Sequence, residues 1–207
     1  MAEKKPKSSL RENIEAIIIA IVIAMFIRTF IVQAFKIPSG SMLETLQIGD
    51  QILVNKFIYG VKIPFTGGKT LISVKNPKKG DIVVFKYPED PSKDFIKRVV
   101  ATEGDTLEII NKKLYVNDKL VEGETYAVYK TRDIIPGSYS SRDNLKKIIV
   151  PEKKLFVMGD NRDNSHDSRF WGFVDLTAVK GEAFIIYWSW NKNKFGVRWN
   201  RIGDILL

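Results

Sequence analysis

The stretch Leu114-Tyr-Val-Asn-Asp-Lys-Leu-Val121 (LYVNDKLV) decides the fold class of this chain. Short apolar runs stand on both sides of Asn117-Asp118, two residues that readily form a tight turn. Two strand-like runs joined by such a turn predict an antiparallel β-hairpin.

Similar short runs continue outward from this hairpin in both directions, and no long amphipathic helical stretch follows Phe35. Clusters of Gly and Pro at 64–68, 76–80, 88–91 and 136–137 separate them, as turns separate strands. We therefore predict a mainly β fold over residues 36–207, an antiparallel and partly closed β-barrel-like catalytic domain, with a polar insertion around 122–150. The predicted strands are Gln51–Asn55, Asp81–Tyr87, Phe95–Ala101, Thr106–Ile110, Leu155–Met158 and Glu182–Trp188.

The N-terminal region differs, because Ala16–Ile27 contains no polar side chain. Residues 13–35 supply the roughly 20 residues that a membrane-spanning helix needs, with Arg28 near enough to one end to reach the headgroups. The preceding tail, residues 1–12, is basic through Lys4, Lys5, Lys7 and Arg11, which predicts a cytoplasmic N-terminus and places residues 36–207 outside the cytoplasmic membrane. A cleavable secretory signal or a buried core helix is the alternative.

Composition excludes several classes of function. The chain has 207 residues and a net charge of +9, which favours nucleic acid or an anionic membrane surface as a partner. It has no cysteine and only one histidine, His166, so disulfide scaffolds, thiol nucleophiles and multi-histidine metal sites are excluded. The sequence does not indicate an oligomeric state.

Three segments carry residue types suited to chemistry. The first, Ile37-Pro-Ser-Gly-Ser-Met42, places two serines around a glycine directly after the predicted membrane helix. The second, Phe95-Ile-Lys-Arg-Val-Val100, sets Lys97 in an apolar strand, which is costly unless the lysine is neutral or paired. The third, residues 158–172 (MGDNRDNSHDSRFWG), is a dense polar stretch between apolar strands.

Together these segments resemble the signature boxes of bacterial type I signal peptidase, a family of membrane serine proteases that remove signal peptides from secreted proteins. Lys79–Phe85 (KGDIVVF) and the tail with Ile186–Ser189, Val197–Trp199 and Arg201–Gly203 are similar to further family motifs. The order matches from about residue 12 to the C-terminal end. The resemblance is weakest at 122–150.

The resemblance implies a Ser–Lys dyad and signal-peptide-bearing preproteins as substrates, with no metal or cofactor. Ser41 is the implied nucleophile and Lys97 the general base. Ser39 would donate to the oxyanion, and Ser165 would orient Lys97. The implied structural support is an ion pair, Asp167 with Arg169, and a network of Asp160, Asn161 and Arg162. The implied walls of the substrate pocket, which accepts small residues, are Ile37, Met42, Leu46, Phe95 and Ile96.

The chain departs from the family pattern at four positions without losing a reacting residue. Glu44 stands in place of a proline. Ala101 and Glu103 replace the residues that the family pattern has after the segment Phe95–Val100. Lys79 replaces an arginine. These changes affect the expected shape of the pocket more than the chemistry.

The dyad requires a neutral amine, whereas a free lysine titrates near about 10.4. Burial would lower the pKa of Lys97, and Arg98, if within reach, would lower it further. A Ser41–His166–Asp167 triad is the competing arrangement. Two hypotheses from different classes of protein are a membrane-tethered binding module without activity and an autoprotease of the SOS-repressor type. Because a hydrophobic segment precedes Ser41, the predicted partner of the positive charge is the lipid bilayer rather than nucleic acid.

Overall fold

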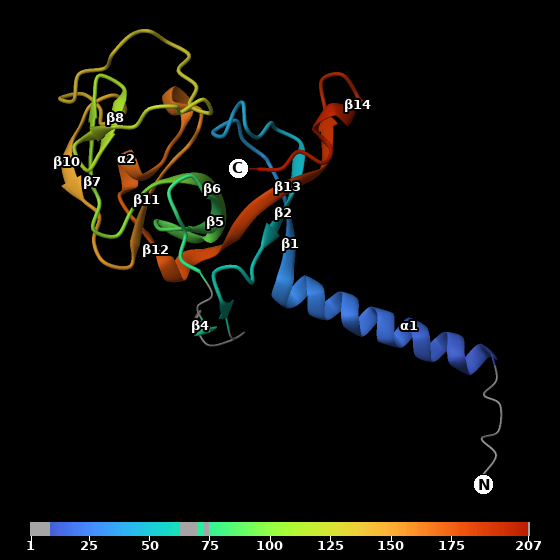
Figure 1. Cartoon of the computed structure of the whole chain (residues 1–207). Coiled ribbons are helices and arrows are strands. Elements are labelled where there is room, and N and C mark those ends of the chain that lie inside the picture. Colours follow the sequence, from blue (N-terminus) through green and yellow to red (C-terminus); the bar gives the residue numbers. More distant parts are fainter. Residues whose placement is uncertain (1–8, 63–69, 73–74, 207) are drawn as a thin grey trace.

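A computed structural model of the chain describes residues 9–62, 70–72 and 75–206, in which antiparallel β-structure dominates (Figure 1). The largest sheet has eight strands. Their order is β1 (Val32–Lys36), β2 (Asp50–Asn55), β13 (Val179–Asn191), β5 (Ile82–Tyr87), β6 (Asp90–Thr102), β11 (Lys154–Met158) and β12 (Val174–Asp175), and β14 (Gly196–Val197) pairs with β13.

The predicted hairpin lies in a second sheet and is confirmed. Val116 pairs with Lys119, and Asn117 and Asp118 adopt φ values of 53° and 62°, the left-handed conformation that a two-residue hairpin turn requires. This sheet has the order β10 (Leu145–Ile149), β7 (Thr106–Ile110), β8 (Lys113–Val116) and β9 (Lys119–Leu120). A third sheet pairs β3 (Val61–Lys62) with β4 (Thr70–Ile72).

Three apolar clusters form the core, and each arises from the strand periodicity of the sequence. In β2, Ile52 and Val54 are fully buried, and the residues that alternate with them are partly exposed. They pack with Ala183 and Ile186 of β13. A second cluster fills the space between the main sheet and the β7–β8 sheet, and a third packs under the helix α2 (Ser168–Trp171).

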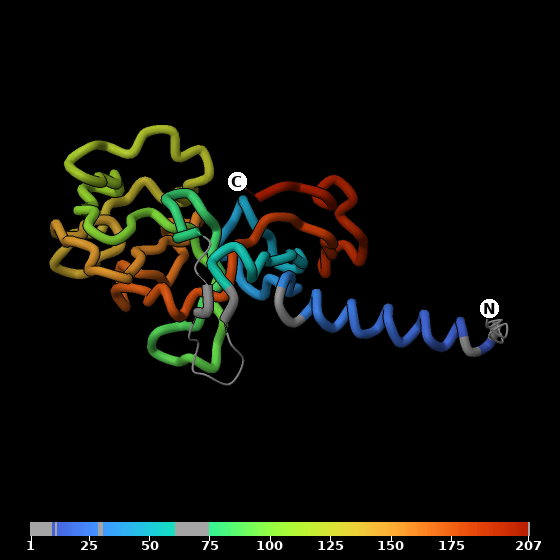
Figure 2. The backbone as a smooth tube through the Cα atoms, turned by 60° about the horizontal axis from the view of Figure 1, so that its bottom comes forward, coloured from blue at the N-terminus to red at the C-terminus, as the bar shows by residue number. Residues whose placement is uncertain are grey.

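The N-terminal region departs from the prediction for residues 13–35. Helix α1 spans Ser9–Phe26 and extends away from the β-sheets (Figures 1 and 2). A short π-helix, Ile27–Ile31, follows it, and Val32–Lys36 then forms β1. A helix over 13–35 is thus wrong, because the last four residues of that range, Val32 to Phe35, pair with the edge of β2 together with Lys36.

Across the described ranges, no helix combines the length and the apolar composition that crossing a membrane requires. Helix α1 has 18 residues and carries three charges in its first two turns, Arg11, Glu12 and Glu15. The large apolar side chains from Ile14 to Ile27 are exposed.

The antiparallel β fold is confirmed, but the expected partial closure into a barrel is corrected by the structure. Within the described residues, the path of the main sheet begins at β1 and ends at β12, which do not pair with each other. Strand β12 has only two residues and so cannot offer β1 an edge of matching length. The predicted turn cluster at 64–68 lies outside the described residues, as does the basic tail up to Ser8.

Candidate active site

Ser41 lies in the turn that joins β1 to β2, and this turn is fixed at its base. Ile37 N donates to Asp50 O at 2.8 Å, and Gly49 N donates to Ile37 O at 3.0 Å. Met42 and Leu46 anchor the turn from below, because both side chains are fully buried in the cluster of β2 and β13. The turn therefore presents Ser41 on a rigid support.

Lys97 extends from β6 to this serine. Its Nζ lies 2.7 Å from Ser41 Oγ and donates to the Ile96 carbonyl at 3.0 Å. Only 4% of Lys97 is exposed, and burial lowers its pKa from the ordinary 10.5 to about 8. The carboxylates of Asp167 and Asp160 oppose this shift, and the Arg169 guanidinium assists it. Arg98, which was expected to assist, instead pairs with Asp160.

The polar stretch after β11, residues 159–172, which we call the polar box, packs against the Ser41 turn. A Cβ on Gly159 would lie 2.2 Å from Ser165 Oγ and 2.4 Å from Ser41 O, so only glycine permits the approach. The Ser165 hydroxyl is buried and makes no hydrogen bond of ordinary geometry within the described residues, yet it lies close enough to Asp167 to favour its carboxylate. Orientation of Lys97 by Ser165 stays a prediction.

Asp160 and Asn161 hold the Ser41 turn from the side. Asp160 is fully buried and accepts two hydrogen bonds from Arg98, at 2.9 and 3.0 Å, and one from Thr45 Oγ1 at 2.6 Å. Asn161 donates its backbone N–H to Ser41 O at 3.1 Å and its side-chain amide to Gly40 O at 2.9 Å. The sequence indicated a network here but missed that Arg98 and Thr45 complete it.

The expected ion pair between Asp167 and Arg169 is present. Arg169 Nε and Nη2 donate to the carboxylate at 2.8 Å each, and Gly159 N donates to it at 3.0 Å. Burial works to raise the pKa of Asp167, but the Arg169 guanidinium outweighs it and holds this pKa below its usual range. Arg162 pairs with Glu124, a partner that the sequence analysis did not identify.

The other predicted site residues are only partly brought together. Ile96 packs against the cluster that contains Ile37, Met42 and Leu46. Phe95 packs against a different cluster, although its ring centroid lies 5.4 Å from Lys97 Nζ. Ser39 is exposed two residues before Ser41.

The contacts of His166 do not support the alternative triad. Its exposed ring lies against Phe170, and its Nε2 is 3.3 Å from the Tyr87 hydroxyl. The carboxylate that a triad would require, that of Asp167, is bound by Arg169. Within the part of the chain that is described, no group of three or more His, Asp or Glu side chains is placed to hold a metal ion.

A serine hydroxyl against a buried lysine of lowered pKa, on a rigid β scaffold, is the arrangement of a hydrolase that uses lysine as its base. The family model described as signal peptidase, peptidase S26, matches residues 10–188. The chain belongs to this family and is a peptidase.

Two relatives can be aligned with this chain over most of their length. Signal peptidase I of Aquifex aeolicus is 38% identical, over 87% of this chain and 85% of its own. Signal peptidase I of Pseudomonas aeruginosa is 36% identical, over 88% and 75%. A crystal structure of a signal peptidase I from Enterococcus faecalis V583 is 28% identical and covers 53% of this chain and 98% of its own, with a TM-score of 0.42.

Proposed function

We propose that this chain is a serine endopeptidase that removes N-terminal signal peptides from exported preproteins, cutting after small residues. Ser41 is the nucleophile and Lys97 the general base. The buried 2.7 Å contact between Lys97 Nζ and Ser41 Oγ carries this proposal. Its relatives, which are signal peptidases I, support the substrate class.

The geometry suits acylation. The neutral amine of Lys97 removes the proton from Ser41 Oγ as this oxygen attacks the scissile carbonyl carbon. The developing oxyanion is stabilised by the Ser41 backbone N–H and by the hydroxyl of Ser39, which is exposed on the same turn. The Lys97 ammonium then protonates the leaving amine, and the mature protein departs.

Deacylation uses the same amine. Lys97, neutral again, takes a proton from a water molecule that attacks the acyl-enzyme carbonyl, and then returns a proton to Ser41 Oγ as the signal peptide leaves. Both half-reactions therefore require the Lys97 amine to be neutral and to lie beside Ser41 Oγ. In this mechanism Ser165 and the ion pair of Asp167 with Arg169 hold the amine at that position.

Specificity for small residues follows from a shallow apolar floor. Met42 and Leu46 are fully buried, so they support this floor from beneath, and the partly exposed side chains beside them form its surface. Ile37 and Ile96 border this floor, and Phe95 closes the side next to Lys97. A large side chain before the cut would collide with this floor, whereas alanine would fit.

We also propose that the chain acts at the outer face of the cytoplasmic membrane, with the apolar side chains of α1 against lipid. The exposed apolar side chains of α1 support this location. Trp199 and Phe195, exposed near the C-terminal end, would rest at the lipid surface. Preproteins tethered by uncut signal helices would then meet the site at a raised effective concentration.

The proposed function is tested by incubating the detergent-solubilised chain with a preprotein and sequencing the new N-terminus of the product. One cut after a small residue is expected. His166→Ala should retain most of this activity, because His166 contacts neither Ser41 nor Lys97. Loss of activity in His166→Ala, with its fold intact, would contradict the assigned pair.

The pH dependence of cleavage follows from the pKa of Lys97. Because this pKa is about 8, the neutral amine becomes scarcer as pH falls below that value. We expect kcat/KM to rise about tenfold per pH unit up to pH 8 and to level off above it. Initial rates on a preprotein from pH 5 to pH 9.5 measure this. A flat profile would refute the role of Lys97.

A further inference from the structure

The guanidinium of Arg169 is held on three sides. Its side chain is 2% exposed, and two of its nitrogens bind the Asp167 carboxylate. The remaining hydrogen bonds go to two backbone carbonyls, from Nη1 to Arg142 O at 2.8 Å and from Nη2 to Arg162 O at 2.7 Å. The position of Arg169 thus depends on where these two carbonyls lie.

Each of these carbonyls belongs to an arginine that is itself clamped by a carboxylate. Arg142 donates to Asp143 from Nε at 2.9 Å and from Nη2 at 2.7 Å. Arg162 donates to Glu124 from Nη1 at 3.0 Å and from Nη2 at 2.6 Å. Two-point contacts of this kind fix orientation as well as distance. Both carboxylates come from residues 124–143, which we call the clamp segment.

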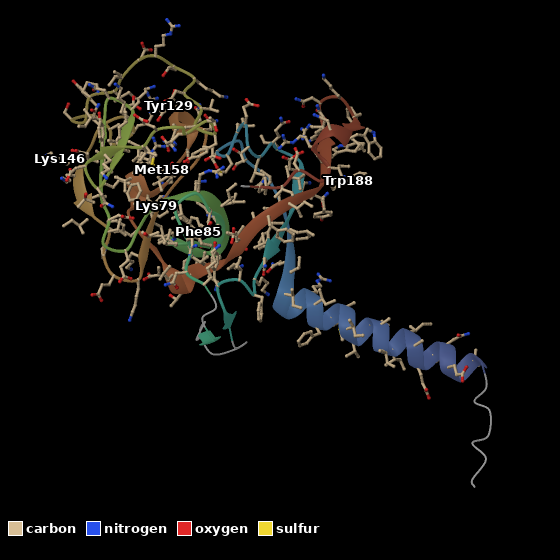
Figure 3. The ribbon with its side chains drawn as sticks, in the orientation of Figure 1. Lys79, Phe85, Tyr129, Lys146, Met158 and Trp188 are labelled. Carbon is tan, nitrogen blue, oxygen red and sulfur yellow. The ribbon has the colours of Figure 1, made fainter. Side chains whose placement is uncertain are left out.

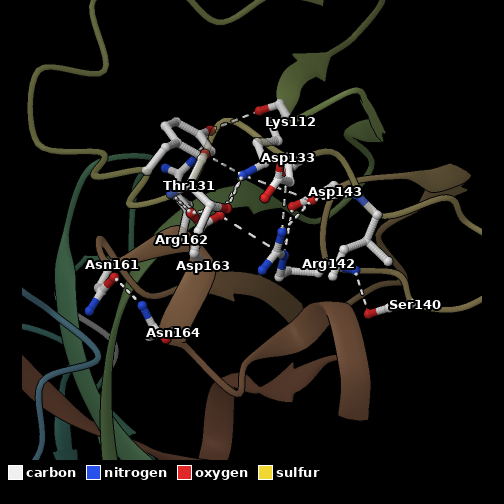
Figure 4. A network of polar contacts seen from close by, with 12 residues as sticks. Lys112, Thr131, Asp133, Ser140, Arg142, Asp143, Asn161, Arg162, Asp163 and Asn164 are labelled. Carbon is white, nitrogen blue, oxygen red and sulfur yellow. Dashed lines mark hydrogen bonds and ion pairs between the residues drawn. The ribbon is translucent and has the colours of Figure 1, made fainter.

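The clamp segment contains neither helix nor long strand, yet polar contacts hold it in place (Figure 4). Asp143 is 1% exposed and also accepts from Ile135 N at 2.9 Å. Thr131 N donates to Asp163 at 2.8 Å, and Lys112 Nζ, also bound to Asp163 at 2.9 Å, lies 3.9 Å from Asp143. These contacts join the clamp segment to Lys112 and to Asp163.

The ion pair lies close to the proposed site, because Gly159, whose N donates to the Asp167 carboxylate at 3.0 Å, also packs against Ser41 O. Charged groups on the polar box act on Lys97: Asp167 and Asp160 favour its ammonium, and Arg169 opposes it. Arg98, next to Lys97 on β6, is neutralised by Asp160. No charged group of the Ser41 turn contacts Lys97 among the described residues. The balance between Asp167 and Arg169 therefore acts directly on the charge of Lys97.

We propose that the clamp segment is a positioning element for catalysis, which holds the Asp167–Arg169 ion pair at a fixed place beside Lys97 through Asp143 and Glu124. The inference rests on the proposed function and extends it to a part of the chain outside the reacting groups. Asp143 and Glu124 are positioning residues, since neither contacts Ser41 or Lys97.

Asp143→Asn tests this, because it keeps the size of the side chain and removes the charge that clamps Arg142. With its carbonyl acceptor loosened, Arg169 should neutralise Asp167 less well, and the Lys97 ammonium gains stability. We expect the rising limb of the kcat/KM–pH profile to move up by about 0.5 to 1 pH unit. Cleavage at pH 7 should then fall about three- to tenfold, with little loss at pH 9.5.

Two further variants make the test selective. Glu124→Gln loosens the other carbonyl and should move the profile in the same direction. Tyr139→Ala is the matched control, because Tyr139 lies in the clamp segment, is 85% exposed and makes no side-chain contact to Arg142 or Arg162 among the described residues. It should leave the profile unchanged.

The proposal is overturned if Asp143→Asn and Glu124→Gln lower kcat/KM by the same factor at every pH. It is also overturned if they lower the midpoint of thermal unfolding and leave the kcat/KM–pH profile unchanged. If Asp143→Asn does not fold, Glu124→Gln alone decides between these outcomes. Failure of the proposed function is distinguishable, since wild type and Ser41→Ala would then be equally inactive on the preprotein at every pH.

Discussion

Lys97→Met is expected to abolish cleavage of a preprotein while raising the stability of the folded chain at pH 7. In the proposed mechanism both proton transfers pass through the amine, so its removal should lower kcat/KM by about 10⁴-fold or more. Methionine matches the length of the apolar stem and adds no charge. Activity and stability should therefore change in opposite directions, which an ordinary core mutation does not produce.

The gain in stability comes from burial of the lysine. A pKa that falls from 10.5 in the unfolded chain to about 8 in the folded one corresponds to roughly 3 kcal/mol of folding free energy lost at pH 7. Between pH 8 and pH 10.5 the unfolded chain holds the proton and the folded chain does not, so the stability of the wild type rises with pH. The advantage of Lys97→Met should thus be largest below pH 8 and vanish above pH 10.5.

Denaturant unfolding of both proteins at pH 7 and at pH 10.5 measures this difference. Allowing for the lost hydrogen bond to Ile96 O, we expect a gain of about 1–3 kcal/mol at pH 7. Lys146→Met is the matched control, since Lys146 is exposed on β10 (Figure 3), and its stability should be unchanged at both pH values. If Lys97→Met is less stable than the wild type at pH 7, then burial of the lysine amine does not cost folding free energy.

The strands of the core were predictable because their burial repeats every second residue or covers both faces. Thus Gln51–Asn55 matches β2, and Ile82–Tyr87 lies within the predicted run from Asp81. The hairpin at Asn117-Asp118 was predictable because only a few residue types adopt its turn. In these places local preference and tertiary packing agree.

Six strands were missed, and in the two longest of them, β1 and β10, local preference and packing disagree. Val32–Lys36 continues an apolar helical run, and only the open edge of β2, which is distant in sequence, makes it a strand. Strand β10 lies within the predicted polar insertion, since Lys146 and Lys147 face solvent at the edge of its sheet. Neither edge is visible in a local window of sequence.

In the site, too, some features follow from local sequence and others only from tertiary contacts. An apolar strand around Lys97 indicated an unusual lysine, but its serine partner came only from the family resemblance, because 56 positions separate the two residues. The roles of Arg98 and Glu124 depend on contacts across the fold. A sequence pattern marks which residues are costly to bury, whereas their partners are set by tertiary structure.

Arg98→Met is expected to destabilise the fold by about 3–5 kcal/mol, the cost of leaving one member of a buried ion pair alone. Arg98 and Asp160 are 1% and 0% exposed, and two hydrogen bonds join them. A third bond, from Arg98 Nη1 to Gly80 O at 2.8 Å, would also be lost. Of the side-chain donors among the described residues, the Asp160 carboxylate would keep only Thr45. Denaturant unfolding at pH 7 measures the loss.

A double variant separates the unpaired charge from the lost packing. Arg98→Met with Asp160→Leu removes both charges and fills the space with apolar atoms, which in buried pairs is often neutral or stabilising. It should recover most of the stability, short of the contribution of Thr45, whose hydroxyl loses its acceptor. If the double variant is as unstable as Arg98→Met, the loss comes instead from packing of the guanidinium on the Tyr126 ring, 4.0 Å away. Because Thr45 and Asn161 tie this network to the Ser41 turn, the recovered double variant should still cleave more slowly than the wild type.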